Sequence, residues 1–467
     1  MVHQFTDSGE NIVLDVESGA IHVVSDVAGR LIPFVQKALD EGKDPNQISV
    51  TAQMLSANAQ SNHPEDVTEA WGEIITLYRS GQLFSSGIAA DLAEKVSKRK
   101  PIVKALCLNV THTCNLACRY CFAEKGKYQI NVNDSEPKLM SVETACRAID
   151  FLVENAEDRV HLEIDFFGGE PLLSWETIKE AVSYARGLEA TRGKVFRFTL
   201  TTNGLLLTEA MFDFINREME NVILSIDGRR EINDAMRPKP CGGGSYDDII
   251  DCFMKLAVSR EQKNYFLRGT FTRYNLDFSE DVRHLADLGF TRISLEPVVT
   301  VGDEDYTIRS EDVPAICDEY DKLAGFIIDR HQAGKPIDFF HFMVDLAGGP
   351  CLTKRLGGCG AGSEYLAVTP GGKLYPCHQF VGNTAFCIGN LDDGIVNDTL
   401  GDEFRAVHVF SKPECRSCFA RYYCSGGCAA NSFRTGGSIC AYDEIACALE
   451  RKRVEKALAC AVICERT

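Results

Sequence analysis

The first hundred residues carry the pattern of a small, separate module. Apolar and polar positions alternate on both sides of Glu17, Ser18 and Gly19, which predicts a two-stranded hairpin. Helical spacing follows twice, and a basic run that ends in a proline at 97–101 interrupts the pattern. The sequence therefore predicts a winged-helix-like domain over 1–96. Its expected elements are strands at 11–15 and 20–24 and helices at 27–39 and 67–78.

The segment 97–310 alternates short apolar runs with amphipathic stretches. Strand-then-helix units joined by right-handed crossovers predict a parallel α/β sheet that is covered on both faces and curled into a partial barrel. Such sheets place their chemistry at the C-terminal ends of the strands. The expected strands lie at 105–110, 161–167, 195–201, 221–226, 264–272 and 292–297, with helices at 142–155, 175–188, 209–218, 246–258 and 278–288.

The last part of the chain differs in composition. Residues 351–467, which follow a bridging segment at 311–350, hold 12 of the 20 cysteines, glycine-rich turns and few long periodic segments. This composition is typical of a domain that metal ligands stabilise more than a large core does.

The charge and the chain ends exclude several classes of protein. The chain has 49 basic and 67 acidic residues, a formal net charge of -18, which repels nucleic-acid phosphates and anionic lipid. The N-terminus lacks the features of a signal peptide, and the apolar run at 457–464 is too short to span a membrane. We therefore expect a cytoplasmic protein without nucleic-acid or membrane partners, whose reduced cysteines serve metal binding or catalysis.

Three cysteines follow the first expected barrel strand. Cys114, Cys118 and Cys121 share one loop, at the mouth of the predicted barrel. Structural zinc is the simpler alternative, but zinc normally takes four ligands in paired spacing. Three thiolates would instead leave one iron of a [4Fe-4S] cluster open for a substrate or cofactor.

This CxxxCxxC loop resembles the defining motif of the radical SAM superfamily, and the aromatic Tyr120 before the last cysteine is also typical of it. The resemblance implies that residues 97–310 form a partial (β/α)6 radical SAM barrel. It also implies that the open iron binds S-adenosylmethionine and that one electron from the cluster cleaves it to a 5'-deoxyadenosyl radical. An electron donor such as flavodoxin or ferredoxin would supply that electron.

The ends of the next barrel strands agree with the same family. Gly168, Gly169 and Glu170 end the second strand and match the motif that contacts the cofactor's amino group. Taken singly, each match has an ordinary strand-to-helix turn as its alternative, but their order along the chain is that of the family. The further cofactor contacts that the resemblance implies are Asn203 after the third strand, Ser225 and Asp227 after the fourth, and Arg237.

The C-terminal cysteine string resembles the SPASM domain, which holds two auxiliary iron-sulfur clusters. In that family's interleaved connectivity the first cluster is bound by Cys359, Cys377 and Cys428, with Cys351 as its fourth ligand or with that position open. The second is bound by Cys415, Cys418, Cys424 and Cys447. The resemblance thus implies three [4Fe-4S] clusters in the chain. Two zinc knuckles are the alternative for this domain, and Cys440 is the rival to Cys447.

Together the three domains resemble maturases of ribosomally made peptides. The N-terminal unit resembles a precursor-peptide recognition element, in which the leader of the peptide adds a strand to the edge of the hairpin. A DNA-binding winged helix is the alternative, but it needs a basic recognition helix, and the stretch 67–73 is acidic.

Several long sequence segments most resemble the SCIFF maturases of the sactipeptide and ranthipeptide class, which install thioether cross-links in Cys-rich peptides. The resemblance implies that the radical abstracts a hydrogen atom from the peptide, that a substrate thiolate joins the resulting carbon, and that an auxiliary cluster accepts the electron released. Formylglycine-forming sulfatase maturases, carbon-carbon cross-linking maturases and an iron-sulfur electron carrier stay open as alternatives. The segments that carry this resemblance are 11–20, 348–351, 365–370 and 375–380.

Overall fold

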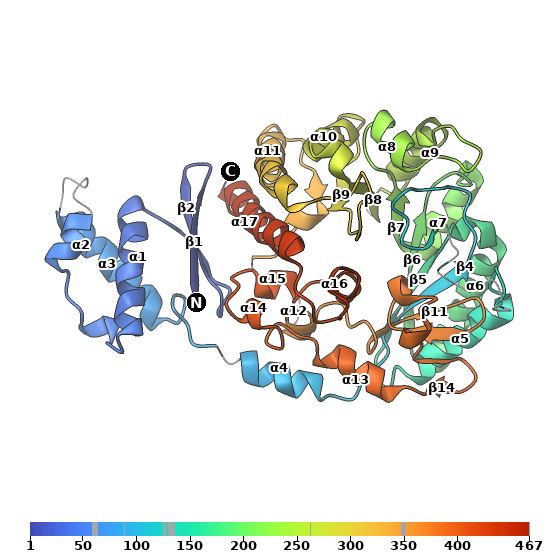
Figure 1. The fold of residues 1–467 in the computed structure, drawn as a ribbon, viewed down its shortest axis with the longest axis horizontal. Coiled ribbons are helices and arrows are strands. Elements are labelled where there is room, and N and C mark those ends of the chain that lie inside the picture. The colour runs from blue at the N-terminus through green and yellow to red at the C-terminus, as the bar shows by residue number, and fades with distance from the viewer. Residues whose placement is uncertain are drawn as a thin grey trace.

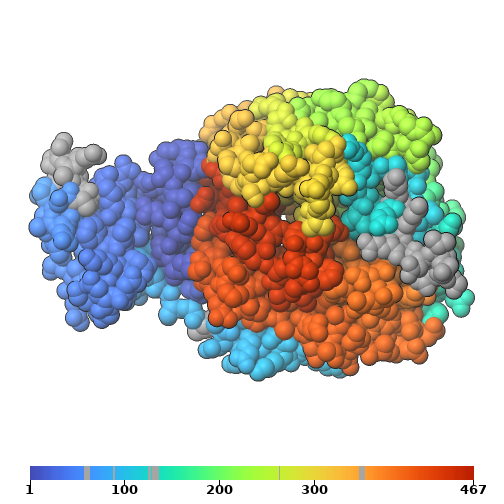
Figure 2. All heavy atoms as spheres, viewed as in Figure 1, coloured from blue at the N-terminus to red at the C-terminus, as the bar shows by residue number. Residues whose placement is uncertain are grey.

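The computed structural model has an N-terminal lobe beside a larger body (Figures 1 and 2). It describes residues 1–57, 64–87, 89–124, 128, 136–261, 263–346 and 352–466. In these residues no helix is long and apolar enough to cross a membrane.

The N-terminal lobe is an antiparallel sheet packed against helices. The sheet has the order β1-β2-β3, with β1 (Val2–Asp7), β2 (Glu10–Asp15) and β3 (Ile21–Val24). The helices are α1 (Asp26–Asp40), α2 (Ala52–Ala57) and α3 (Pro64–Arg79). Val13, Leu31 and Trp71 belong to a buried cluster between sheet and helices. The expected hairpin and both expected helices are confirmed, whereas the sequence pattern missed β1 and α2.

The body is built on a parallel sheet in which β4 to β10 follow one another in chain order. Figure 1 shows these strands along an arc with helices on its outer side, and the expected partial barrel is confirmed. The strands are β4 (Ala105–Thr111), β5 (His161–Gly168), β6 (Val195–Thr202), β7 (Met219–Ser225), β8 (Asn264–Phe271), β9 (Arg292–Pro297) and β10 (Asp338–Phe339). The helices are α5 (Val142–Glu154), α6 (Trp175–Arg192), α7 (Phe212–Glu218), α8 (Arg230–Met236), α9 (Tyr246–Ser259), α10 (Phe278–Asp287) and α11 (Val313–Gln332).

Successive side chains along the barrel strands face opposite sides of the sheet. On β8, Tyr265, Leu267 and Phe271 are buried in the core that the helices cover, while Phe266 and Arg268 on the other face line cavities. Because side chains alternate along a strand, the second set faces the inside of the barrel. That inner face positions the sites described below.

The cysteine-rich part extends the barrel sheet at its other edge. β11 (Tyr365–Val368) pairs in parallel with β4, and β12, β13 and β14 continue it in antiparallel fashion, which gives a mixed sheet. The sequence did not predict this extension, because strands of two to four residues carry too little periodicity. The further elements are β12 (Lys373–Tyr375), β13 (Gly389–Asn390), β14 (Gly394–Ile395), α4 (Ala89–Ser97), α12 (Leu352–Gly357), α13 (Asp398–Ala406), α14 (Pro413–Arg416), α15 (Arg421–Cys424), α16 (Ala429–Gly436) and α17 (Glu444–Arg466).

Short 3-10 helices occur mostly where strands and helices connect. They are Pro45–Gln47, Pro171–Ser174, Glu209–Met211, Arg273–Asn275, Ser310–Asp312, Phe340–Phe342, His378–Phe380 and Thr384–Phe386.

The N-terminal sheet is packed against the cysteine-rich part. Leu14 and Val16 share one buried cluster with Val454 and Leu458 of α17. Ion pairs join the same two parts: Glu17 with Arg421, whose side chain is 3% exposed, and Asp7 with Lys456. The module is therefore held to the body by a shared core and by buried charges.

Candidate functional site

The loop with the first three cysteines is held by the glycines that end β5. The backbone N–H of Gly169 donates to the carbonyl of Thr111 at 2.9 Å, and the N–H of Glu170 donates to that of Thr113 at 2.9 Å. A Cβ atom on Gly169 would lie 2.0 Å from the oxygen of Thr113, which no real side chain tolerates. The glycine is required because the two backbone segments approach so closely.

A cavity of about 260 Å³ opens at this loop. It is lined by residues from the C-terminal ends of several barrel strands, where sheets of this kind place their chemistry. Most of the predicted cofactor contacts share this wall. They are Cys114, Cys118, Tyr120, Cys121, Gly168, Gly169, Glu170, Asn203, Ser225 and Arg237.

Glu170 and Asn203 connect the ends of two barrel strands to the cysteine loop through hydrogen bonds. The Glu170 carboxylate accepts hydrogen bonds from the Thr202 hydroxyl at 2.7 Å and from the Asn203 backbone N–H at 2.7 Å. Burial raises the pKa of Glu170, and these hydrogen bonds oppose that rise. The Asn203 side-chain amide in turn donates to Asn115 at 2.8 Å and to the sulfur of Cys114 at 3.7 Å. The strand ends thus set the orientation of the first cysteine.

Tyr120, Asp227 and Arg237 form one buried network. The Tyr120 hydroxyl donates to both oxygens of Asp227, at 2.7 and 2.8 Å, and accepts from the Arg237 guanidinium at 2.8 Å. Tyr120 and Arg237 line the cavity, whereas Asp227 lies behind them. Asp227 does not line the cavity, so its contact with a cofactor stays a prediction. Burial raises the pKa of Asp227, and Arg237 lowers it.

The donor set of this cavity fits an iron-sulfur cluster with S-adenosylmethionine. Burial raises the pKa of the Cys118 thiol to about 12, so the free thiolate is disfavoured there, and a bound cation would reverse that preference. Arg237 Nε is buried and has no hydrogen-bond partner among the described residues, which leaves a donor for a carboxylate at the cavity wall. No three Cys, His, Asp or Glu side chains in the described part of the chain form a site for a single metal ion.

A second cavity, of about 520 Å³, collects the C-terminal cysteines. Cys447 lies near Cys415 and Cys418: burial, together with the charges of those two thiols, raises its pKa to about 11. Burial also raises the pKa of Cys424, and the charges of Glu450, Cys447 and Cys415 add to that rise. The four predicted ligands of the second auxiliary cluster therefore come together.

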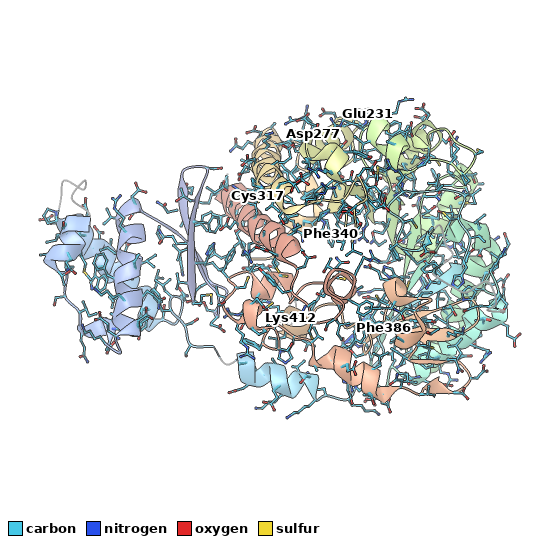
Figure 3. All side chains as sticks on the ribbon, viewed as in Figure 1. Glu231, Asp277, Cys317, Phe340, Phe386 and Lys412 are labelled. Atoms are coloured by element: carbon cyan, nitrogen blue, oxygen red, sulfur yellow. The ribbon has the colours of Figure 1, made fainter. Side chains whose placement is uncertain are left out.

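The other predicted group forms beside it. Burial raises the pKa of Cys377, and the charges of Cys428 and Cys359 add to that rise. The Lys412 side chain (Figure 3) lies against the same cavity and donates to the Gly426 carbonyl at 2.9 Å. Cys440 is exposed and does not line the cavity. Cys351 lies outside the described residues, so its ligation stays a prediction.

Sequence reasoning missed the residues that join the two cavities. Arg268 of β8 and Glu296 of β9 line both, and their side chains form an ion pair at 2.9 Å. Gln379 and Asn431 of the cysteine-rich part also line both. Strand alternation could have placed Arg268 and Glu296 inside the barrel, but nothing in the pattern showed that the cysteine-rich part closes over them.

Comparison with known families identifies both domains. Residues 108–259 match the radical SAM superfamily, and residues 359–419 match the SPASM family, an iron-sulfur cluster-binding domain. The chain thus has a radical SAM α/β fold with a C-terminal SPASM domain. These domains imply bound [4Fe-4S] clusters and S-adenosylmethionine.

Several known proteins are similar to this chain. The chain is 23% identical over 381 residues to the radical SAM cyclopropyl synthase TigE of Paramaledivibacter caminithermalis, covering 76% of this chain and 74% of TigE. Its fold matches native anSMEcpe with bound AdoMet at a TM-score of 0.63 and 19% identity, over 78% of this chain and 99% of that one. Streptococcus suis SuiB bound to precursor peptide SuiA matches at 0.52 and 16% identity, over 95% and 98%.

Proposed function

We propose that the chain is a peptide maturase that installs thioether cross-links between cysteine thiols and carbon atoms of acceptor residues in a Cys-rich precursor peptide. The observation that carries the proposal is the union, in one chain, of a radical SAM cavity, an adjoining cavity of cysteine ligands and a sheet with a free edge. The SuiB structure, which holds a precursor peptide, supports a peptide substrate because its likeness extends over 95% of this chain.

One of the two edge strands of this sheet is β3. Among the described residues β3 pairs with β2 alone, which leaves its other side for an added strand of the leader. The exposed face of α3 carries Glu65, Asp66, Glu69 and Glu73, and this acidic face argues against nucleic acid as the partner.

The edge of β3 can be tested without disturbing its pairing with β2. The Asp15 N–H donates to the Ala20 carbonyl, and hydrogen-bonded pairs alternate along an antiparallel ladder, so the N–H of Val23 points to the free side. Val23→Pro should weaken leader binding about tenfold, the cost of a lost backbone hydrogen bond. Val23→Thr is the matched control. Equal leader affinity of both variants and wild type would refute binding at this edge.

The proposed reaction balances in atoms and electrons. Cys114, Cys118 and Cys121 would hold the cluster that supplies one electron, and S-adenosylmethionine would supply methionine and the 5'-deoxyadenosyl radical. One hydrogen atom would pass from a carbon of the peptide to that radical. The substrate thiol would lose its proton to a base and form the C–S bond, and the one electron left over would go to an acceptor held by the SPASM cysteines.

We propose three [4Fe-4S] clusters because the cysteines fall into three groups. Cys359, Cys377 and Cys428, with Cys351 or a substrate thiolate as the fourth ligand, would hold the first auxiliary cluster. Cys415, Cys418, Cys424 and Cys447 would hold the second. Arg237, with its free Nε, is the proposed partner of the cofactor's carboxylate.

Mass spectrometry of the peptide tests the thioether. The reconstituted enzyme is incubated anaerobically with S-adenosylmethionine, a reductant and a short Cys-rich precursor peptide. Each cross-link should remove two hydrogen atoms and protect one cysteine from iodoacetamide. An unchanged peptide, while S-adenosylmethionine is cleaved, would refute the proposed function for that substrate.

Two other products are possible for an enzyme of this kind, and the same mass spectrum distinguishes them from a thioether. TigE is a cyclopropyl synthase, and its similarity favours carbon-carbon bond formation as the second candidate. Such a product also loses hydrogen but keeps every cysteine open to iodoacetamide. A formylglycine product would show the replacement of cysteine sulfur by an aldehyde oxygen, in a reaction that needs no leader-binding module.

A further inference from the structure

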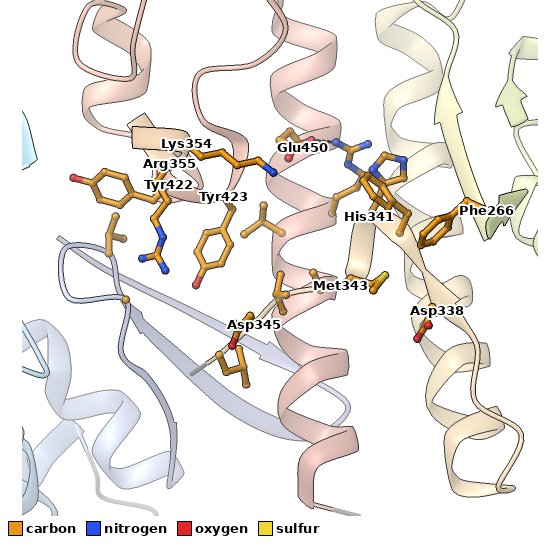
Figure 4. A pocket seen from close by; sticks show the side chains of 18 of the residues that line it. Phe266, Asp338, His341, Met343, Asp345, Lys354, Arg355, Tyr422, Tyr423 and Glu450 are labelled. Carbon is orange, nitrogen blue, oxygen red and sulfur yellow. Dashed lines mark hydrogen bonds and ion pairs between the residues drawn. The ribbon is translucent and has the colours of Figure 1, made fainter. Parts of the chain in front are cut away.

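A third cavity lies between the N-terminal module and the barrel. It has a volume of about 780 Å³. One wall is the turn between β2 and β3, residues Val16 to Gly19, and another is formed by Asn221, Asn264 and Arg292 at the N-terminal ends of barrel strands. Figure 4 shows side chains from the cysteine-rich part, such as Lys354 and Tyr423, reaching the same space. The cavity therefore lies at the end of the barrel opposite the Cys114 loop.

The inner face of the barrel links this cavity to the radical site. Along β8, Phe266 lines the third cavity, and Arg268, two residues further, lines the cavity of the Cys114 loop. Two residues of a strand span only about 7 Å. His341 lines both the third cavity and the cavity of the auxiliary cysteines. The three cavities are thus neighbours along the inner face of the barrel.

The module presents the edge strand β3 beside the third cavity. β3 starts at Ile21, directly after the turn that lines the third cavity, and it runs away from the cavity. A strand added antiparallel to β3 would therefore run toward the cavity and release its C-terminal end at Ser18 and Gly19. In a precursor the core follows the leader, so this direction delivers the core to the cavity.

We propose that the third cavity and the inner face of β7 to β9 form the channel through which the core of the peptide substrate reaches the radical site. This inference rests on the proposed function and names the path of its substrate. The ligand is an extended peptide segment, recognised through its backbone.

The polar atoms of the channel suit a peptide backbone. Asn221 is half-buried and lines the cavity, and a side-chain amide can hydrogen-bond to the backbone of the segment. The charged side chains at the walls are partly neutralised by one another: Arg292 lies 3.5 Å from Asp338, and Arg453 pairs with Glu450. The wall therefore favours no strong charge of either sign on the peptide.

The length of the channel sets a minimum spacer in the substrate. Arg292 lines the entrance and Glu296, four residues further along β9, lines the radical cavity, a rise of about 13 Å. About four extended residues are needed to cover that distance. Shortening the segment between the leader and the first modified residue to fewer than about four residues should leave leader binding intact and abolish conversion. Unchanged conversion of the shortened precursor would overturn the channel.

Blocking the entrance provides a second test. Asn221→Trp should reduce conversion of the Cys-rich precursor about tenfold or more. Cleavage of S-adenosylmethionine without peptide should persist, because Ser225 at the cofactor end of β7 is unchanged. Val195→Trp is the control: Val195 is 40% exposed at the start of β6 and does not line the cavity. Conversion by Asn221→Trp at the control rate would overturn the proposal, whereas no conversion by wild type would instead refute the proposed function.

Photo-crosslinking keeps the test independent of that substitution. A benzoylphenylalanine placed at Phe340, which is 51% exposed in the third cavity, should form an adduct with the core of the bound precursor. The same probe at Val258, which is 81% exposed and does not line the cavity, should form none. Adducts confined to the leader, or equal labelling from both positions, would overturn the channel.

Discussion

The two cysteine sites of this molecule are built in different ways. The Cys114 loop rests on the ends of long parallel strands, and the backbone of Gly169 and Glu170 holds it at 2.9 Å. Among the auxiliary cysteines, Cys415 lies in α14 and Cys424 ends α15, helices of four residues each. Helices that short are not stable by themselves, so the second site depends on its neighbours and its ligands. We expect the first site to keep its shape without metal and the second to lose it.

The largest effect is expected at the first site. Replacing Cys114, Cys118 and Cys121 with Ala should abolish cleavage of S-adenosylmethionine and remove about four irons per chain, while the auxiliary irons stay. Iron analysis and the yield of 5'-deoxyadenosine measure this result. Cys241→Ala, at an exposed cysteine outside both cavities, is the control. Stoichiometric zinc without iron in the wild-type protein would contradict the account.

Removing all metal should separate the two sites. After chelation, amide hydrogen exchange should rise strongly across 413–428, because the thiolates lose the ions that hold the short helices together. The amides of β5 and β6 should stay protected, since they lie in the buried sheet. Equal loss of protection in both regions would show that the sites do not differ in this way.

A single methyl group should damage the first site. Gly169→Ala places a Cβ against the Thr113 carbonyl and must move the cysteine loop, so cleavage of S-adenosylmethionine should fall about a hundredfold. Gly187→Ala on α6, where a Cβ meets nothing within 4 Å, is the matched control. Full activity of Gly169→Ala would contradict the close approach of the two loops.

The smallest effect concerns the turn at the channel entrance. Asp15 accepts hydrogen bonds from the backbone and hydroxyl of Ser18 and Ser85; burial raises its pKa, but these bonds outweigh it and hold the pKa below its ordinary value. The carboxylate therefore stabilises the module above the ordinary pKa of Asp, and this stability is lost as the pH falls below it.

Asp15→Ala should cost about 1–3 kcal/mol and remove that pH dependence. Hydrogen exchange of the module between about pH 5 and pH 2 checks both expectations. The same slope in wild type and variant would show that another group is responsible.

The predictable part of the fold is the part with long periodic elements. The strands β4 to β9 could be predicted because their buried faces give runs of apolar residues bounded by turns. β1 was missed. So were β11 to β14, because strands of two to four residues carry too little periodicity to be recognised. The cysteine grouping came from family resemblance, since spacing alone does not distinguish the possible pairings.

Residue roles inside the site were predictable only where backbone geometry requires them. Gly169 followed from its motif, and the structure shows the contact that requires it. Asp227 shared the same kind of evidence, yet Tyr120 and Arg237 separate it from the cavity. Arg268 and Glu296 carried no motif, because their importance depends on how the SPASM domain closes the barrel.

One isotope experiment tests most directly whether the radical site and the peptide act together. The precursor is prepared with deuterium on the carbon atoms of its acceptor residues and incubated anaerobically with the enzyme and S-adenosylmethionine. The account predicts one deuterium in 5'-deoxyadenosine for each thioether formed. Thioether formation without transfer of deuterium to 5'-deoxyadenosine would contradict it, as would transfer with every cysteine thiol of the peptide still free.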